Sequence, residues 1–174
     1  MSYDTQKKGI MKIIYVVGDA TLPIKLPAFI PHIVNDVGLW GNGFVVALSK
    51  RFGRGPHTPE GMYRTWNKST MFYKSPFELG EIQSVVLDEI IIVNMIAQHG
   101  IRGTKPLDLK ALDICLEKLY IATGYCSDKM SKNFTVHMPR IGCGLAGGVW
   151  EEIEPIILKY INTDTYVYDF ERET

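Results

Sequence analysis

Short apolar segments alternate along the chain with longer segments in which apolar residues recur every three or four positions. The short segments are rich in β-branched residues and predict strands over 12–17, 28–34, 82–87, 90–97, 134–138 and 165–170. The longer segments predict helices over 44–52, 107–121 and 150–160, and a further helix that begins at Pro59, where Thr58 can cap it. This alternation indicates an α/β fold around a central, mostly buried sheet.

Two details refine the predicted sheet. Asp88 and Glu89 separate two of the strands and predict a hairpin between them. Pro31 lies inside the strand over 28–34. Because proline has no backbone N–H to give to a neighbouring strand, we expect this strand to be irregular or to lie at an edge.

The composition restricts the class of protein. The length of 174 residues fits one domain, and 19 basic residues balance 19 acidic ones, so a general nucleic-acid binder is not expected. The longest apolar runs, such as 90–93, are too short to span a membrane. The chain has an odd number of cysteines without metal-ligand spacing, namely Cys115, Cys126 and Cys143. This pattern predicts reduced thiols in a cytoplasmic protein, and no metal or cofactor is expected.

The start of the chain differs from the rest. Residues 1–10 are polar and lack the apolar stretch of a signal peptide, so we expect them to form a flexible extension. Residues 11–174 are then expected to form a single domain. No oligomerisation signal is present in the sequence, and the expected state is a monomer.

Two glycine-rich segments, 41–43 and 140–148, each precede a predicted helix. In α/β folds such loops reach the crevice beyond the carboxyl ends of the strands, where their N–H groups and the helix N-terminus attract a phosphate or diphosphate. Neither segment is a P-loop or a dinucleotide fingerprint, and tight-turn glycines are an equally common explanation. Asp19 follows the first strand; its carboxylate suits an exocyclic amine such as adenine N6, although turn or cap aspartates are commoner.

Five stretches together resemble a macrodomain, the ADP-ribose-binding family, over residues 11–170. They read VGDA (17–20), HIVN (32–35), GLWGNGF (38–44), MPRIGCGLAGGVW (138–150) and VYDF (167–170). The stretch 35–43 is most similar to the macrodomains that act as ADP-ribose 1″-phosphate phosphatases. The resemblance implies a three-layer α/β/α sandwich with a mixed, mostly parallel sheet of about six strands and an ADP-ribose cleft.

The resemblance also implies roles for particular residues. Asp19 would bind adenine N6 beside Gly18 and the Ala20 backbone, and Tyr168 or Phe170 would cover the adenine. Asn35 would contact the distal ribose. The residues implied to line that ribose and the diphosphate are Gly41, Asn42, Gly43, Ile141, Gly142, Cys143, Gly144, Leu145, Ala146 and Gly147. Arg140 is expected either to add charge near the phosphates or to form a surface pair.

The candidate catalytic residues are His32, Asn35 and His99. Relatives that remove ADP-ribose from proteins use a lysine in the loop after the central strand, and some use an aspartate directly after GCGL. Here the segment 94–100 has no lysine and Ala146 follows GCGL, which disfavours the lysine mechanism. His32 matches the histidine of the phosphatase relatives and suits acid–base work near neutral pH; His99 is the second candidate, and both can equally be structural.

The expected function is therefore binding of ADP-ribose and metal-independent hydrolysis of ADP-ribose 1″-phosphate to ADP-ribose and phosphate. Two alternatives remain open at this point. One is a non-catalytic ADP-ribose reader. The other is a hydrolase that removes ADP-ribose from modified macromolecules or deacetylates O-acetyl-ADP-ribose. The expected partner is ADP-ribose or a derivative of it, with no membrane and no general nucleic-acid binding.

Overall fold

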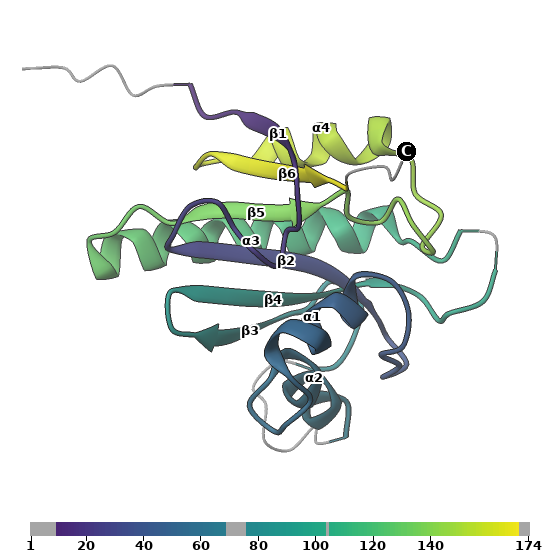
Figure 1. Ribbon diagram of the computed structural model, residues 1–174. Coiled ribbons are helices and arrows are strands. Elements are labelled where there is room, and N and C mark those ends of the chain that lie inside the picture. Colours follow the sequence, from purple (N-terminus) through teal and green to yellow (C-terminus); the bar gives the residue numbers. More distant parts are fainter. Residues whose placement is uncertain (1–9, 69–75, 104, 171–174) are drawn as a thin grey trace, which may run out of the picture.

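The strands and helices follow one another much as the apolar pattern predicts (Figure 1). The protein is described by a computed structural model over residues 10–68, 76–103 and 105–170. Its strands are β1 (Ile13–Val17), β2 (Ala28–Asn35), β3 (Ile82–Leu87), β4 (Ile90–Gln98), β5 (Thr135–Pro139) and β6 (Thr165–Asp169). Its helices are α1 (Phe44–Phe52), α2 (Pro59–Lys68), α3 (Leu109–Met130) and α4 (Trp150–Tyr160). Of the predicted extension over 1–10, all but Ile10 lies outside the described residues.

The strands form one mixed sheet in the order β1-β6-β5-β2-β4-β3. Each neighbouring pair is parallel except β3 and β4, which form the predicted antiparallel hairpin at the edge of the sheet. Asp88 at the turn adopts a positive φ of 57°, a conformation that aspartate tolerates better than most residues. The mostly parallel sheet that the sequence predicts is confirmed.

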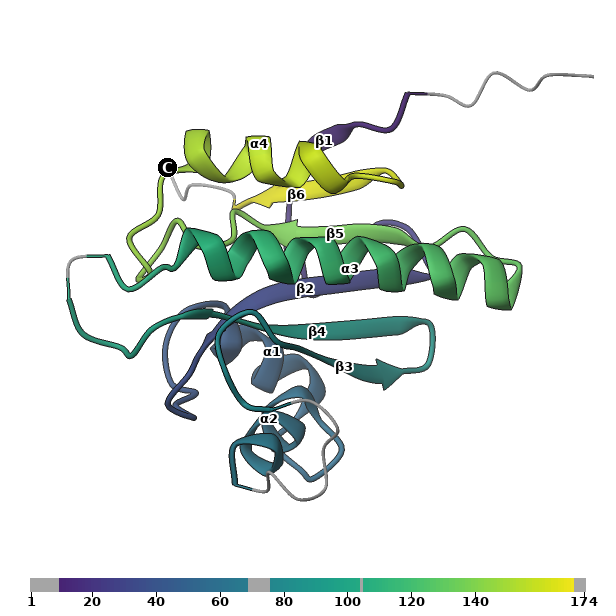
Figure 2. The same ribbon diagram turned by 180° about the vertical axis from the view of Figure 1, so that it is seen from behind.

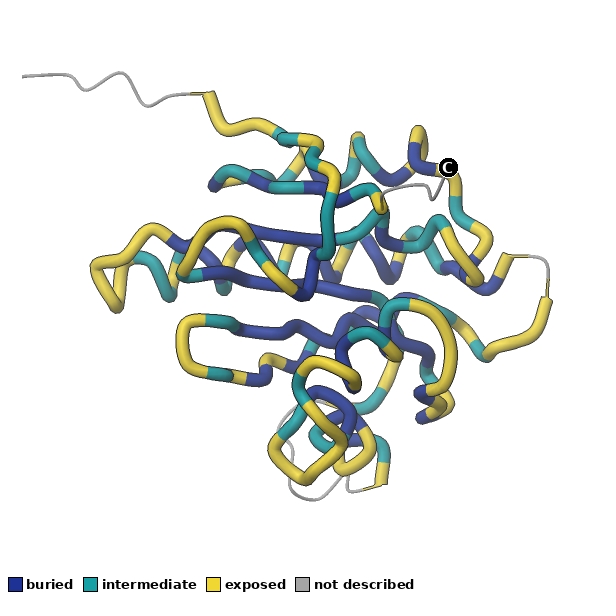
Figure 3. Tube along the Cα trace, in the orientation of Figure 1, coloured by how far each residue is buried: buried dark blue, intermediate teal, exposed yellow. Residues whose placement is uncertain are grey.

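Helices cover both faces of the sheet and make the predicted three layers. Helices α3 and α4 lie on one face, and α1 and α2 lie on the other, over β2, β4 and β3 (Figures 1 and 2). Two apolar clusters fill the interfaces, one with α3 and α4 and one with α1 and α2, and the central strands are buried (Figure 3). This burial on both faces explains why the strands read as continuous apolar runs.

The strand that contains Pro31 lies in the middle of the sheet. Of the two alternatives predicted for this strand, the position at an edge is therefore wrong. Strand β2 pairs with β4 along its whole length, but it pairs with β5 only at Ala28 and Phe29. Proline lacks an N–H, and the pairing with β5 ends before it. The predicted irregularity is confirmed, because the register with β4 also shifts between Val34 and Asn35.

Helix α3 is the element whose length the sequence predicts least well. It continues to Met130, nine residues beyond the predicted end at 121, and Ser131 ends it with a φ of 51°. Its last turns carry exposed residues such as Tyr125 and Met130, so the apolar pattern fades before the helix ends. Within the described ranges, neither α3 nor any other helix is long and apolar enough to cross a membrane.

Candidate functional site

A cleft of about 530 Å³ opens at the carboxyl ends of β2, β5 and β6, beside the N-terminus of α1. Both predicted glycine-rich segments contribute to its wall. The predicted site residues that line it are His32, Asn42, Gly43, Ile141, Gly142, Cys143, Gly144, Leu145, Ala146, Tyr168 and Phe170. The predicted site residues outside the lining are Gly18, Asp19, Ala20, Asn35, Gly41, His99 and Gly147.

The loop between β5 and α4 is held in a tight turn by its own backbone. The N–H of Gly148 donates to the carbonyl of Gly142 at 2.7 Å, and Gly142 has a φ of 74°, which favours glycine. The carbonyl of Ala146 accepts from Leu107 at 3.1 Å. The N–H groups of Gly144, Leu145 and Ala146 have no hydrogen-bond partner in the part of the chain that the structure describes. These N–H groups belong to lining residues and can bind an anion.

The N-terminus of α1 supplies a second anion-binding feature to the same cleft. Gly43 caps the helix with a φ of 80°, and no side chain accepts a hydrogen bond from the first turn. The first turn contains no acidic residue. The N–H of Val46 donates to the carbonyl of Gly43 at 3.1 Å, whereas the N–H groups of Phe44 and Val45 have no hydrogen-bond partner among the described residues. These two N–H groups and the positive end of the helix dipole can interact with a negatively charged ligand next to Phe44, another lining residue.

Arg140 borders the cleft as part of a closed ion pair. Its Nε and a terminal N–H donate to the two carboxylate oxygens of Asp169 at 2.6 and 3.0 Å. The guanidinium also lies 5.1 Å from the ring centre of Tyr15 and 5.3 Å from that of Trp150. The hydrogen bond to Asp169 raises the pKa of Arg140, and the pair brings no net charge to the cleft. Of the two expectations for Arg140, the structure shows the pair.

The cleft ends on one side at β1 and β6. Gly18 donates to the carbonyl of Asp169 at 2.8 Å, which places Asp19 next to Phe170. One carboxylate oxygen of Asp19 accepts from the N–H and hydroxyl of Thr21, both at 2.8 Å. Phe170 leaves 67% of its surface exposed, whereas the hydroxyl of buried Tyr168 is bonded to His137 and to the N–H of Ile24. Phe170 is thus the aromatic face available at this end.

No protein-family model matches the sequence, but solved structures do match. A Bacteroides thetaiotaomicron protein of unknown function is 42% identical, over 92% of this chain and 99% of its own, with a TM-score of 0.79. A macrodomain protein from Streptomyces coelicolor is 37% identical, over 91% of this chain and 99% of its own, with a TM-score of 0.72. The chain belongs to the macrodomain family.

A curated relative of this macrodomain is much longer. The mouse chromodomain-helicase-DNA-binding protein 1-like is 30% identical over 91% of this chain. The chain spans only 18% of that relative's length, so the likeness concerns one part of it. The predicted family is confirmed by these comparisons, and the closer likeness to phosphatase-type macrodomains stays a prediction.

His32 is buried at the wall of the macrodomain cleft, with 1% of its surface exposed. Its Nε2 lies 2.5 Å from Oδ1 of Asn94, and its ring packs edge-on against Trp40. Burial lowers the pKa of His32 to about 4, although the hydrogen bond with Asn94 opposes this, so the ring is neutral at pH 7. Among the described residues Nδ1 has no hydrogen-bond partner.

Asn35 organises the turn that leads from β2 to α1. Its Nδ2 donates to the carbonyl of Leu39 at 2.7 Å, and its Oδ1 accepts from the N–H groups of Val37 and Leu39. The hydroxyl of Tyr63 donates to the backbone carbonyl of Asn35 at 2.7 Å and lies 2.9 Å from the same Oδ1. The amide is thus engaged with protein groups, and the geometry shows a structural role; the contact with a distal ribose stays a prediction.

His99 lies in the loop after β4, away from the cleft lining. Its Nδ1 is 2.7 Å from Asp36, whose other oxygen accepts from the N–H of Gly100. The hydrogen bond with Asp36 raises the pKa of His99. His99 and Asp36 together fix the start of this loop to the end of β2, which gives Asp36 a role that the sequence does not reveal.

The sequence does not single out Gln98, which lines the cleft at the end of β4. Its Nε2 donates to the carbonyl of Gly100 at 3.0 Å. Asn35 pairs with Gln98 after the register shift in β2, and this pairing brings the ends of β2 and β4 together. The only signal in the sequence was its place at the end of a central strand.

In the described residues, no group of three His, Cys, Asp or Glu side chains could hold a metal ion.

Proposed function

We propose that the cleft binds ADP-ribose. The observation that carries the proposal is that two sets of unpaired N–H groups, in the loop 141–147 and at the start of α1, border one cleft. The Thermosipho africanus DarTG structure holds ADP-ribose and shares the fold with a TM-score of 0.60, at 16% identity over 84% of this chain and 38% of its own. The N–H groups would bind the diphosphate, which requires no unpaired basic side chain.

The proposed direction of the ligand follows from the residues at the two ends of the cleft. The adenine would lie at the β1 and β6 end, where Phe170 can stack on it and the second carboxylate oxygen of Asp19 can accept from its amino group. The distal ribose would lie toward β2 and β4, near His32, Asn42 and Gln98. The diphosphate would then cross the loop after β5, which lies between these two ends of the sheet.

Isothermal titration calorimetry with ADP-ribose tests the binding proposal. We expect binding to the unmodified protein and weaker binding to Asp19→Ala. Asp128→Ala serves as the matched control, because Asp128 is exposed near the far end of α3. The absence of heat at millimolar ADP-ribose would contradict the proposal. Equal affinity in Asp19→Ala and the control would remove the adenine role of Asp19.

A second candidate, hydrolysis of ADP-ribose 1″-phosphate, is favoured by His32, which lines the cleft and whose buried Nδ1 has no hydrogen-bond partner among the described residues. Water would attack the phosphorus, the bond from phosphorus to the 1″ oxygen would break, and Nδ1 would accept a proton from the water. The leaving oxygen would take a proton from solvent. N–H groups of the loop would stabilise the charge that develops on the phosphoryl oxygens.

Phosphate release separates the hydrolytic candidate from a reader. Release that is lost in His32→Ala and retained in His57→Ala, where the histidine is exposed, supports the phosphatase. Binding of ADP-ribose without phosphate release supports a reader. Release of ADP-ribose from a modified protein or nucleic acid, without phosphatase activity, supports the third function, a hydrolase acting on macromolecules.

A further inference from the structure

A chain of buried side-chain amides leads from the cleft to α2. Asn94 stands opposite His32 in the β2 and β4 pairing, and both side chains lie on the face covered by α1 and α2. Nδ2 of Asn94 lies 3.0 Å from Oε1 of Gln83 and 3.3 Å from the carbonyl of Pro59. Nε2 of Gln83 in turn lies 3.0 Å from the carbonyl of Met62.

Two backbone carbonyls at the start of α2 decide how these amides are oriented. A carbonyl can only accept, so the amide atoms that face Pro59 and Met62 must be the NH₂ groups. Oε1 of Gln83 then faces Asn94 and accepts from it. Oδ1 of Asn94 is left facing His32, as an acceptor, at 2.5 Å from Nε2. Nε2 must therefore carry the hydrogen.

We propose that Asn94 is a positioning residue, which holds His32 as the Nε2–H tautomer so that Nδ1 meets the ligand as a hydrogen-bond acceptor. The proposal rests on the proposed binding of ADP-ribose. The matching ligand group is a donor, which at this end of the cleft is a hydroxyl of the distal ribose. A neutral ring is needed for this, and the burial of His32 keeps its pKa well below 7.

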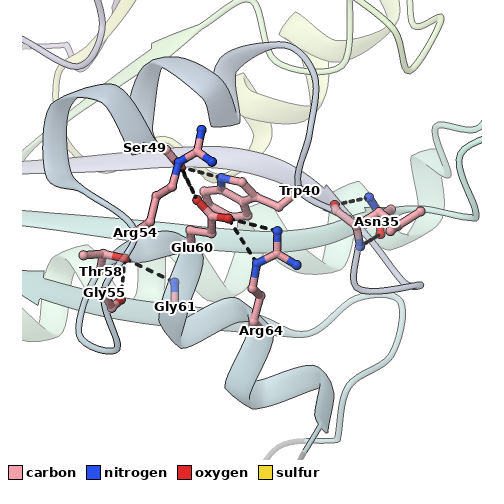
Figure 4. Close-up of polar contacts among 10 residues, drawn as sticks. Asn35, Trp40, Ser49, Arg54, Gly55, Thr58, Glu60, Gly61 and Arg64 are labelled. Carbon is pink, nitrogen blue, oxygen red and sulfur yellow. Dashed lines mark hydrogen bonds and ion pairs between the residues drawn. The ribbon is translucent and has the colours of Figure 1, made fainter.

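The surrounding residues hold the whole arrangement in place. Glu60, next to Pro59, is buried and binds Ser49 of α1 at 2.7 Å and Arg64 at 2.9 Å (Figure 4). Ser49 accepts from the indole N–H of Trp40 at 2.8 Å, and that indole packs against His32. Helix α2 is thus anchored to α1 directly behind the histidine.

The tautomer can be read directly by long-range ¹H–¹⁵N correlation NMR of the free protein at pH 7. The chain has four histidines, and His32→Gln identifies the His32 signals by their loss. We expect a protonated Nε2 and a bare Nδ1. A protonated Nδ1, or a doubly protonated ring, would overturn the proposal. This result does not depend on ligand binding, so it stays decisive even if calorimetry shows that ADP-ribose does not bind.

Ligand titration tests the second half of the proposal. ADP-ribose should move the Nδ1 resonance of His32, whereas ADP, which lacks the distal ribose, should leave it in place. A shift with both ligands, or with neither when calorimetry shows that ADP-ribose binds, would refute the contact with the distal ribose. The exposed ring of His99 serves as the internal control and should respond to neither ligand.

Asn94→Asp tests the positioning role. A carboxylate at this position would favour the doubly protonated ring, so Nδ1 would become a donor. We expect the NMR signature of the imidazolium and about tenfold weaker binding of ADP-ribose with unchanged binding of ADP. If Asn94→Asp does not fold, Asn94→Leu is the second variant: it removes the acceptor that faces Nε2 and should leave His32 as a mixture of the two neutral tautomers. A neutral, unchanged His32 in both folded variants would contradict the positioning role.

Discussion

The loop between β5 and α4 offers a sharp test of the proposed binding site, at Gly148. A Cβ added there would lie 2.5 Å from the carbonyl oxygen of Gly142 and 2.5 Å from Cδ2 of Leu107. The same carbonyl accepts the 2.7 Å hydrogen bond that closes the loop. Gly148→Ala therefore forces the backbone oxygen away from its position and opens the turn that presents the N–H groups.

The structure gives the size of the effect. The oxygen would have to move by about 0.9 Å to restore a contact of 3.4 Å, because the Cβ stands at 2.5 Å. Such overpacking costs about 1–3 kcal/mol. For a domain of this length, that is a fall of about 2–12 °C in Tm. Since the N–H groups move with the loop, we also expect binding of ADP-ribose to weaken by at least tenfold, about 1.4 kcal/mol.

Gly144→Ala is the matched control in the same loop. A Cβ at Gly144 meets no atom within 4 Å, so the stability should change by no more than about 0.5 kcal/mol. Thermal unfolding and calorimetry with ADP-ribose measure both quantities for the two variants. An unchanged Tm in Gly148→Ala would refute the steric reasoning. A lower Tm with unchanged affinity would show that the shape of the loop does not determine binding.

Three further predictions concern other parts of the molecule. Asn35→Ala removes three hydrogen bonds of the turn before α1 and should lower the free energy of unfolding in urea by about 2–4 kcal/mol. Phe170→Ala should weaken ADP-ribose binding by about 1–3 kcal/mol without lowering Tm, since the ring is exposed. Burial raises the pKa of Glu60, but hydrogen bonds from Ser49 and Arg64 outweigh it, and the net pKa lies below the usual 4.5. A lowered pKa in the folded state stabilises the fold above pH 4.5, and this stabilisation is lost as the pH falls through the pKa of Glu60 in the folded protein. In Glu60→Gln, the free energy of unfolding in urea should therefore fall less steeply on the acid side of its pH profile.

Local signals allowed much of the fold to be predicted. Helices α1 and α4 have the predicted bounds, because glycine, proline or a clear apolar period marks their ends. The position of β2 could not be read from Pro31, because the neighbours of a strand depend on the whole sheet and not on its own residues. The end of α3 was hidden for a different reason. Its final turns face solvent, and exposed helical turns carry no apolar period.

The sequence predicts the parts of the site that are formed by backbone groups better than the parts that are formed by side chains. Residues 141–146 line the cleft, and the sequence singles them out through a glycine-rich segment and the resemblance to macrodomains. Their contact with a ligand stays a prediction. The partners of His32 and Asn35 were not predictable, since Asn94 and Tyr63 lie far along the chain and meet them only in the folded protein. Gln98 was missed because glutamine at a strand end has no distinctive pattern.

The even balance of 19 basic and 19 acidic residues argues against a general nucleic-acid binder but not against a small anionic ligand. The structure shows how such a ligand can be bound without an unpaired basic side chain. The cation that borders the cleft, Arg140, is paired with Asp169, and the N–H groups of the loop and of α1 are left to meet a negative ligand. Recognition of the diphosphate would therefore depend on the shape of the loop. Recognition of the ligand group beyond the diphosphate would depend on His32. Because Asn94 connects His32 to α2, it would also depend on where α2 lies.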